Sequence, residues 1–278
     1  MKNIDMYKLG FETIMKKNKY IIADIYDYNV YFGNTQRAEF LKEFINTIKK
    51  SDKNINILDI GGGYGSIIEH GISYIPHKKF TIDLIEPILS YRNTYKMLCK
   101  KFNVNFNFYF NDFDDFNKNI SKINYKYNFI FLIHSIYYYL NNYEYLINKC
   151  RDLLNENGKI ILIINDFSNS DIGKFEKLHL IDNNNNAVFE LLNYCKTISD
   201  KYIYQHTYFY AFDKKELIPT LFISNIIKKP DDEEFDKNYI PKAINYINNN
   251  VTIETRKIQQ NKAYRLYNPQ IYIEINKN

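Results

Sequence analysis

The spacing of apolar residues changes from a helical period to a strand period near residue 55. Before that point Phe40, Phe44 and Ile48 recur every four residues, as on one face of an amphipathic helix, and residues 1–54 are predicted to be helical. After it, short continuous apolar runs alternate with helical stretches. The five runs span residues 55–60, 80–85, 106–110, 129–133 and 159–164.

Alternation of this kind predicts a parallel, doubly wound α/β sheet, because crossover helices must cover both of its faces. The run at 129–133 is apolar throughout, as expected of a strand buried on both faces. The intervening helices are predicted to start near Ser66, to end near Lys101, and to span residues 143–154 before the stop signal Asn157–Gly158.

Beyond Asp166 the alternation weakens, and no internal repeat or linker rich in Pro, Gly or Ser divides the chain. We therefore expect an N-terminal helical segment at residues 1–54 and one α/β domain at 55–278. The later elements are predicted to be a helix at 187–199, an aromatic strand at 202–212, a mostly helical insertion at about 213–262 and a strand near 271–275.

A glycine cluster follows the first strand, in the sequence LDIGGGYGSI. Asp59 with Gly61, Gly63 and Gly65 forms a D-x-G-x-G-x-G pattern. Glycine is needed where the backbone turns tightly and approaches a ligand with no Cβ in the way. The helix that follows directs its free N–H groups at the same place, which suits a carboxylate or a phosphate. The motif predicts a nucleotide-type cofactor site, and a ligand-free turn between strand and helix is the structural alternative.

The spacing of this loop favours S-adenosyl-L-methionine (SAM) over a dinucleotide. In the dinucleotide fingerprint the third small residue comes three positions after the second glycine, which is Ser66 here, whereas this sequence has Gly65. Glu86 ends the second strand, 21 residues after Gly65, and a carboxylate there reaches the ribose hydroxyls of either ligand. The tight glycine spacing, together with Asp59, looks like SAM-binding motif I.

Two other residues are candidates for the same cofactor. Asp112 follows the third strand, where class I methyltransferases commonly place a polar side chain beside the adenine amino group. Tyr91, on the helix after the second strand, either covers the ribose or packs against the sheet. Asp114 and Asp115 are interpreted as part of a solvated acidic loop.

Three segments together resemble the histamine N-methyltransferase branch of the class I SAM-dependent methyltransferases: LDIGGGYGSI, LIEPILS and FIFLIHSIYYYL. The resemblance covers residues 25–170 well and the rest of the chain more loosely. It implies a Rossmann-like, mostly parallel sheet of seven strands with helices on both faces and a helical embellishment on the substrate side. It also implies SAM as methyl donor and S-adenosyl-L-homocysteine (SAH) as product, with residues 1–54 on the substrate side.

The resemblance further implies an amine pocket, whose acidic, polar and asparagine positions look like Arg37, His134 and Asn268 here. Arg37 reverses the expected charge and suits a carboxylate, a phosphate or an acidic sugar better than a protonated amine. The chain has 27 tyrosines, and Tyr28 and Tyr138 are candidates for an aromatic wall that contacts a cationic group.

Ile133 and His134 end the fourth strand, next to the expected position of the methyl group. Methyl transfer from a sulfonium is an in-line displacement that depends on positioning in a dry pocket and on a free lone pair on the acceptor. His134 is the candidate base or substrate contact, because neighbours can tune an imidazole across neutrality. A structural hydrogen bond is the alternative role. No pair of histidines has metal-ligand spacing, so no metal is predicted.

Charge and composition restrict the remaining classes. The net charge of +5 comes from scattered lysines rather than a basic stripe, which disfavours nucleic acid as a partner. No apolar run is long enough for a membrane helix, and the start of the sequence lacks a secretory apolar stretch. The three cysteines are widely spaced and are expected to be reduced thiols in a cytoplasmic protein. The sequence predicts no oligomeric state.

The sequence thus predicts a SAM-dependent methyltransferase for a small molecule, with an amine nitrogen as the expected acceptor. An O-methyltransferase acting on a sugar or another hydroxyl is the alternative, which Arg37 would fit. A catalytically silent binding module is a second alternative, disfavoured by the intact glycine loop and Glu86. A nucleic-acid methyltransferase is disfavoured because residues 134–137 lack the N/D-P-P-Y/F motif.

Overall fold

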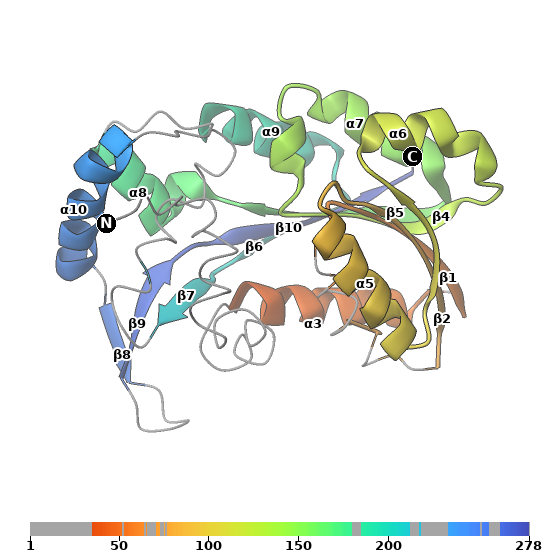
Figure 1. Ribbon diagram of the computed structural model, residues 1–278, viewed down its shortest axis with the longest axis horizontal. Helices are drawn as coiled ribbons and strands as arrows, with labels where there is room; N and C mark the ends of the chain where they lie inside the picture. Colours follow the sequence, from red (N-terminus) through yellow and green to blue (C-terminus); the bar gives the residue numbers. More distant parts are fainter. Residues whose placement is uncertain are drawn as a thin grey trace. The chain divides into compact units, whose positions relative to one another are not determined.

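The computed structural model describes residues 35–51, 53–63, 65, 71–72, 75, 77–179, 185–211, 217, 233–250, 252–255 and 262–277. Seven of the described strands form one sheet in the order β3-β2-β1-β4-β5-β10-β6 (Figure 1). The pairs β1–β2, β1–β4, β2–β3 and β4–β5 are all parallel, so the expected α/β sheet is confirmed. These strands are β1 (Asn54–Ile60), β2 (Lys79–Ile85), β3 (Asn105–Phe110), β4 (Tyr127–Ile133), β5 (Leu154–Asn165), β6 (Lys201–Gln205) and β10 (Gln270–Asn276).

Helices connect most of these strands, close to where the sequence pattern predicts them. The helices are α3 (Thr35–Lys49), α5 (Leu89–Lys101), α6 (Phe113–Asn119), α7 (Tyr143–Leu153), α8 (Asp171–Leu178), α9 (Asn185–Ile198) and α10 (Glu233–Asn250), with short 3-10 turns η2 (Ile120–Lys122), η3 (Ile136–Tyr139) and η4 (Phe167–Asn169). The predicted helical stretch at 1–34 and the predicted helix start near Ser66 lie outside the described residues.

The predicted stop signal Asn157–Gly158 lies inside β5 rather than before it. The pairing of β4 with β5 shifts between Tyr127, which faces Leu154, and Phe129, which faces Lys159. The extra β5 residues form an irregularity of the kind that bulges introduce, and regular pairing begins only at Lys159.

Aromatic packing joins α3 to the sheet. Phe40, Phe44 and Ile48, the residues that show the helical period, are all buried. The ring centroid of Phe44 lies 5.4 Å from that of Phe131 on β4, and the centroid of Phe40 lies 6.3 Å from that of Tyr272 on β10. Burial of such side chains is the main favourable contribution to folding, so this face of α3 is fixed by the hydrophobic effect.

The chain divides into two compact units. One comprises Phe40–Ile164, Glu190–Tyr204 and Ile271–Asn278 and contains most of the large sheet. The other comprises Met1–Glu39, Asn165–Phe189 and Gln205–Gln270. It contains a second sheet in the order β7-β9-β8, made of β7 (Tyr208–Ala211), β8 (Thr252–Thr255) and β9 (Lys262–Tyr267).

This second sheet corrects one expectation about the later elements. The single aromatic strand predicted at 202–212 is divided into β6 and β7, which belong to different sheets. Among the described residues of the insertion at about 213–262, α10 accounts for most, and the short strand β8 pairs antiparallel with β9. The division into β6 and β7 was missed because strand identity here depends on pairing between distant segments, such as Tyr208 opposite Tyr267, which periodicity does not reveal.

All three cysteines, Cys99, Cys150 and Cys195, are free and buried. Burial raises the pKa of the Cys99 and Cys195 thiols to about 12 and also raises that of Cys150. At neutral pH the three thiols are therefore protonated.

None of the described helices combines the length and the apolar character needed to cross a bilayer.

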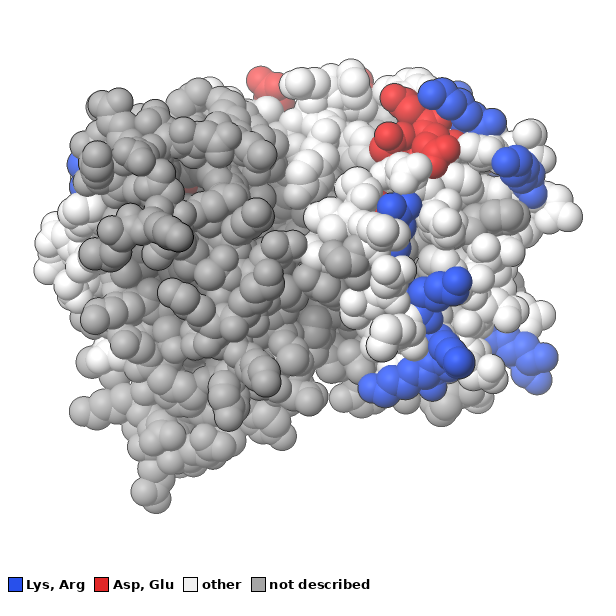
Figure 2. All heavy atoms as spheres, in the orientation of Figure 1, with Lys and Arg blue, Asp and Glu red and all other residues white. Residues whose placement is uncertain are grey.

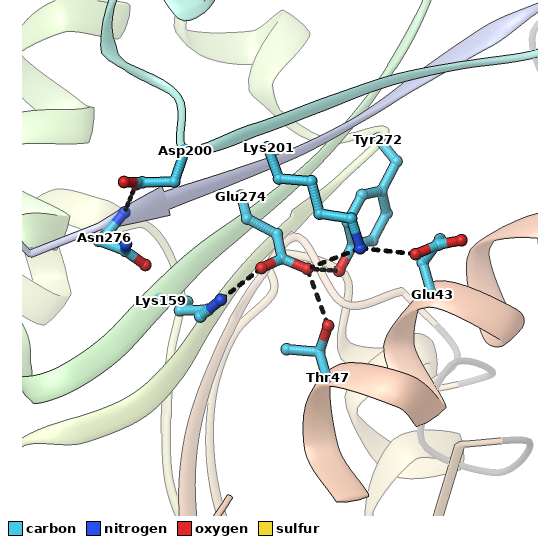
Figure 3. A network of polar contacts seen from close by, with 8 residues as sticks. All are labelled: Glu43, Thr47, Lys159, Asp200, Lys201, Tyr272, Glu274 and Asn276. Atoms are coloured by element: carbon cyan, nitrogen blue, oxygen red, sulfur yellow. Dashed lines mark hydrogen bonds and ion pairs between the residues drawn. The ribbon is translucent and has the colours of Figure 1, made fainter. Parts of the chain in front are cut away.

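A buried carboxylate ties together the part of the sheet next to α3 (Figure 3). Glu274 on β10 accepts hydrogen bonds from the hydroxyls of Thr47 and Tyr272, each at 2.8 Å. Nζ of Lys201, which also pairs with Glu43, lies 3.5 Å from that same carboxylate oxygen, and the other carboxylate oxygen lies 2.5 Å from Nζ of Lys159. Burial raises the pKa of Glu274, but the bonds from Lys159, Thr47 and Tyr272 outweigh burial and leave it below its ordinary value.

We predict that Glu274→Gln lowers the free energy of unfolding at pH 7 by roughly 2 kcal/mol, since Lys159 and Lys201 lose their buried anionic partner. The lowered pKa means that this contribution is present above the unfolded carboxyl pKa and is lost as pH falls through the folded value. Urea unfolding at pH 7 and at pH 3 should therefore show a smaller difference between the two proteins at the lower pH.

The matched control is Glu156→Gln, which removes the exposed partner of Lys277. Exposed ion pairs contribute little, so this variant should unfold like the wild type. Equal loss of stability in both variants would mean that burial of Glu274 does not matter.

Candidate active site

The carboxyl ends of β3, β2, β1, β4 and β5 follow one another along one edge of the sheet. The backbone hydrogen bonds between neighbouring strands continue for one residue beyond the ends of β1 and β4. The N–H of Gly61 donates to Ile85 O at 2.7 Å, and that of His134 donates to Ile163 O at 3.0 Å. The predicted glycine loop, acid and histidine therefore leave the sheet side by side.

The glycine loop after β1 needs glycine for two different reasons. Gly61, Gly63 and Gly65 have φ of 70°, 55° and 75°, in the left-handed region that other residues avoid. The N–H of Gly65 donates to Gly62 O at 3.0 Å, which closes the turn. Around Gly63 no described atom lies within 4 Å of the position that a Cβ would take. The loop thus combines a tight turn with an open face at Gly63.

Glu86 lies directly against this loop. One carboxylate oxygen accepts from the N–H of Gly63 and the other from the N–H of Ile88, both at 3.0 Å. Burial raises the pKa of Glu86, while these two bonds and the positive charge of Arg92 oppose the rise. A carboxylate is therefore held beside the open face of Gly63 by the backbone of two strand ends.

Asp59, which precedes the loop, is buried in the interior. Only 2% of its surface is exposed, and it accepts a hydrogen bond from the hydroxyl of Tyr95 at 2.8 Å. Burial raises the pKa of Asp59 to about 7, the bond from Tyr95 opposes this, and the charge of Glu86 adds to it.

The turn after β4 is the strained part of the site. His134 has φ of 53°, the left-handed region, which costs a residue with a side chain roughly 1 kcal/mol. The next residue, Ser135, is buried and donates its hydroxyl to Ile60 O at 2.5 Å. A Cβ on Gly61 would lie 2.5 Å from the Cβ of Ser135. The turn after β4 and the loop after β1 are therefore in direct contact.

Two tyrosines singled out by the sequence lie on the elements that follow β2 and β4, Tyr91 in α5 and Tyr138 in η3. Tyr138 in η3 is exposed, and desolvation of its hydroxyl together with the negative charge of Glu86 raises its pKa. Tyr91, in the first turn of α5, also raises the pKa of Tyr138. Ile133, the last residue of β4, is half-buried.

The acidic segment after β3 forms a helix, which corrects the expected loop. Asp112 is the N-cap of α6 and accepts from the N–H of Asp115 at 2.7 Å, while Asp114 and Asp115 occupy the first turn, where negative charge stabilises a helix. Figure 2 shows acidic side chains gathered over α6. The negative charge near this edge favours a positively charged ligand.

The predicted substrate residues are only partly described. Tyr28 and the side chain of Arg37 lie outside the described residues, although the backbone of Arg37 belongs to α3. Asn268 is fully buried before β10, in the second unit, where its N–H donates to Thr207 O at 3.0 Å. The structure brings together Gly61, Gly63, Gly65, Glu86, Tyr91, Tyr138 and the end of β4.

Sequence reasoning missed Tyr95, Ser135 and the apolar pair Ile88 and Leu89. The pair follows Glu86 and is 42% and 63% exposed, an unusual placement for such side chains that suits an apolar ligand surface. Ile88 and Leu89 follow Glu86 by two and three residues, and this spacing could have identified them from the sequence. Tyr95 and Ser135 gave no such signal, because their partners are 36 and 75 residues away.

Solved structures with low sequence identity have a similar fold. No curated protein matches the sequence. Among solved structures, a putative methyltransferase from Bacillus halodurans is 10% identical, with a TM-score of 0.51 over 86% of this chain and 99% of that one. The YcgJ protein from Bacillus subtilis is 12% identical, with a TM-score of 0.48 over 87% and 100%. The plantazolicin methyltransferase BpumL, crystallised with SAH, is 14% identical, with a TM-score of 0.42 over 98% and 96%.

The first of these similarities shows the fold, which is that of class I methyltransferases. The family described as "Methyltransferase domain" matches residues 34–201, more than half of the chain and the whole of the edge described above. The chain therefore belongs to the methyltransferase domain family, whose members use SAM as the methyl donor.

Proposed function

We propose that this protein transfers the methyl group of SAM to a small molecule, with an amine nitrogen as acceptor. The observation that carries the proposal is the open face of Gly63 beside the carboxylate of Glu86, at the edge where β1 and β2 end. A left-handed glycine with space where a Cβ would be is a place where backbone can approach a ligand closely.

The residues around this opening fit the parts of SAM. Glu86 supplies a carboxylate for the ribose hydroxyls and keeps both of its oxygens oriented through Gly63 and Ile88. The exposed side chains of Ile88 and Leu89 offer an apolar surface for the adenine ring. Asp112 follows β3, the strand that pairs with β2, and is proposed to contact the adenine amino group.

The acceptor would bind near the end of β4. When bound, SAM supplies an electrophilic methyl group on a positively charged sulfur, so the protein needs mainly to align the acceptor and exclude water. His134 is held at this edge by its backbone and by the neighbouring bond of Ser135 to β1. A neutral imidazole there accepts the proton that an ammonium acceptor must lose before its lone pair can attack.

The finer assignment rests on the resemblance to the histamine N-methyltransferase branch. It supports an amine acceptor, with Tyr138 as one wall and Arg37, Tyr28 and Asn268 as further substrate contacts. Methylation of a hydroxyl instead of an amine would overturn this assignment. The deciding experiment incubates the protein with methyl-labelled SAM and separate pools of small amines and of sugars, and identifies the labelled product by mass spectrometry. Label in the sugar pool alone would replace the amine with a hydroxyl.

We predict that Gly63→Ala weakens SAH binding by about tenfold or more, because its Cβ occupies the open face that the ligand needs. The left-handed backbone adds a stability cost of about 1–2 kcal/mol. Calorimetric titration with SAH and a thermal melt measure the two effects separately. Wild-type affinity in a folded Gly63→Ala protein would remove the ligand from this face.

We predict that Glu86→Ala weakens SAH binding by roughly 1.5–3 kcal/mol, through loss of charge-assisted hydrogen bonds. Glu86→Gln is the matched variant, because it keeps the side-chain shape and one oxygen acceptor while it removes the charge. An intermediate affinity for Glu86→Gln is expected in the same calorimetric assay. If both variants bind SAH as tightly as the wild type, Glu86 does not contact the ribose.

We predict that His134→Asn lowers kcat by about 10²-fold or more and changes the Kd for SAH little. Asparagine tolerates the left-handed backbone of this position, so the variant removes the imidazole without adding strain. Single-turnover kinetics and calorimetry give the two quantities. An equal loss of kcat and of SAH affinity would mean that the histidine has a structural role.

A further inference from the structure

A buried pair of side chains lies beneath the glycine loop. Tyr95 on α5 is fully buried, and its hydroxyl donates to the carboxyl of Asp59, the residue before the end of β1. The pair connects the helix that follows β2 to the strand that leads into the loop. A buried hydrogen bond to a carboxyl group is costly to break, because the partner left behind loses that compensation for its desolvation.

Two glycines of the loop rest directly on this pair. A methyl group at Gly65 would lie 2.7 Å from a ring carbon of Tyr95, and one at Gly62 would lie 2.5 Å from a carboxyl oxygen of Asp59. Contacts this close leave no room for a side chain, so the path of the loop follows the surface that Asp59 and Tyr95 present. Gly63, with its open face, lies between these two supports.

We propose that Tyr95 is a positioning residue for SAM: its ring supports Gly65, and its hydroxyl holds Asp59 under the loop. This proposal rests on the proposed function and concerns the same site. Tyr95 is buried beneath the loop and acts on the ligand only through the glycines and through Asp59. SAM carries one positive charge more than SAH. The affinity for SAM should therefore depend more strongly than the affinity for SAH on whether Asp59 is ionised.

The charged and titratable groups that act on Asp59 are few among the described residues. Tyr95 and Cys99 come from α5, and Glu86 comes from the end of β2. Burial raises the pKa of Asp59 to about 7. The hydrogen bond from Tyr95 opposes this rise, and the negative charge of Glu86 adds to it. A cationic donor binds better when Asp59 is ionised, so SAM affinity should increase as pH rises through about 7.

The test is Tyr95→Phe, which keeps the ring beneath Gly65 and removes only the hydroxyl. Calorimetric titrations with SAM and with SAH, each between pH 6 and pH 9, give affinity and its pH midpoint. We expect SAM affinity at pH 7 to fall roughly tenfold. We also expect the midpoint of its rise to move to higher pH, because Asp59 loses the bond that lowers its pKa. SAH, which lacks the sulfonium charge, should show a smaller pH dependence, and kcat at saturating SAM should change less than twofold.

A second variant tests the same idea without disturbing α5. Asp59→Asn keeps an oxygen acceptor for Tyr95 and is neutral at every pH, so its SAM affinity should lose the rise near pH 7. In the Asp59→Asn background, Tyr95→Phe should produce no further shift of the pH profile.

Tyr127→Phe is the matched control. Tyr127 is another fully buried tyrosine that donates to a buried carboxylate, Asp83, but it lies at the first residue of β4 and far along the strand from the loop. Asp83 keeps the bond from Tyr125 in this variant. The control is expected to lose thermal stability, whereas its SAM affinity and pH midpoint should match the wild type.

The outcomes separate the two proposals. If the wild-type protein binds neither SAM nor SAH, the proposed function fails and the role of Tyr95 fails with it. If the wild type binds both but Tyr95→Phe keeps the wild-type affinity and pH midpoint, only the role of Tyr95 is overturned. A loss of affinity that merely follows thermal stability, as in Tyr127→Phe, with an unmoved midpoint also overturns it.

Discussion

The parallel register between β1 and β2 is the constraint on which the candidate site depends. Ile60 faces Ile85, so the next residues of the two strands, Gly61 and Glu86, leave the sheet at the same level. The bond from the N–H of Gly61 to Ile85 O fixes that level. A slip of one residue would turn every side chain of one strand to the opposite face and separate the acid from the loop. The buried residues of β1 and β2 make such a slip costly.

Much of this half of the molecule could be predicted from the sequence, because its information is local. Each strand is a short apolar run, the glycines follow the first run directly, and Glu86 follows the second. The prediction was wrong where a local pattern had two interpretations. The aspartates after β3 suited a solvated loop, but Asp112 caps a helix with its own side chain. Residues 202–212 suited one strand, but two different partners divide them into β6 and β7.

The residues that support the site could not be predicted from the sequence, for a different reason. Tyr95 and Ser135 matter through contacts with Asp59, Gly65, Ile60 and Gly61, which become neighbours only after the sheet forms. A tyrosine on a helix in a chain of 27 tyrosines carries no mark of such a role. The residues expected to contact the methyl acceptor present the same difficulty, because only the family resemblance supplies positions for them. The residues expected to contact SAM follow from the glycine loop itself.

The three buried cysteines have a practical consequence for work on this protein. A thiol attacks an alkylating reagent only as the thiolate and only when the reagent can reach it. Burial raises the pKa of Cys99, Cys150 and Cys195 and removes each of them from solvent. Their modification therefore requires local or global opening of the chain. The rate of alkylation at each cysteine thus reports the opening of α5, α7 or α9, the helices on which they lie, with no label added to the protein.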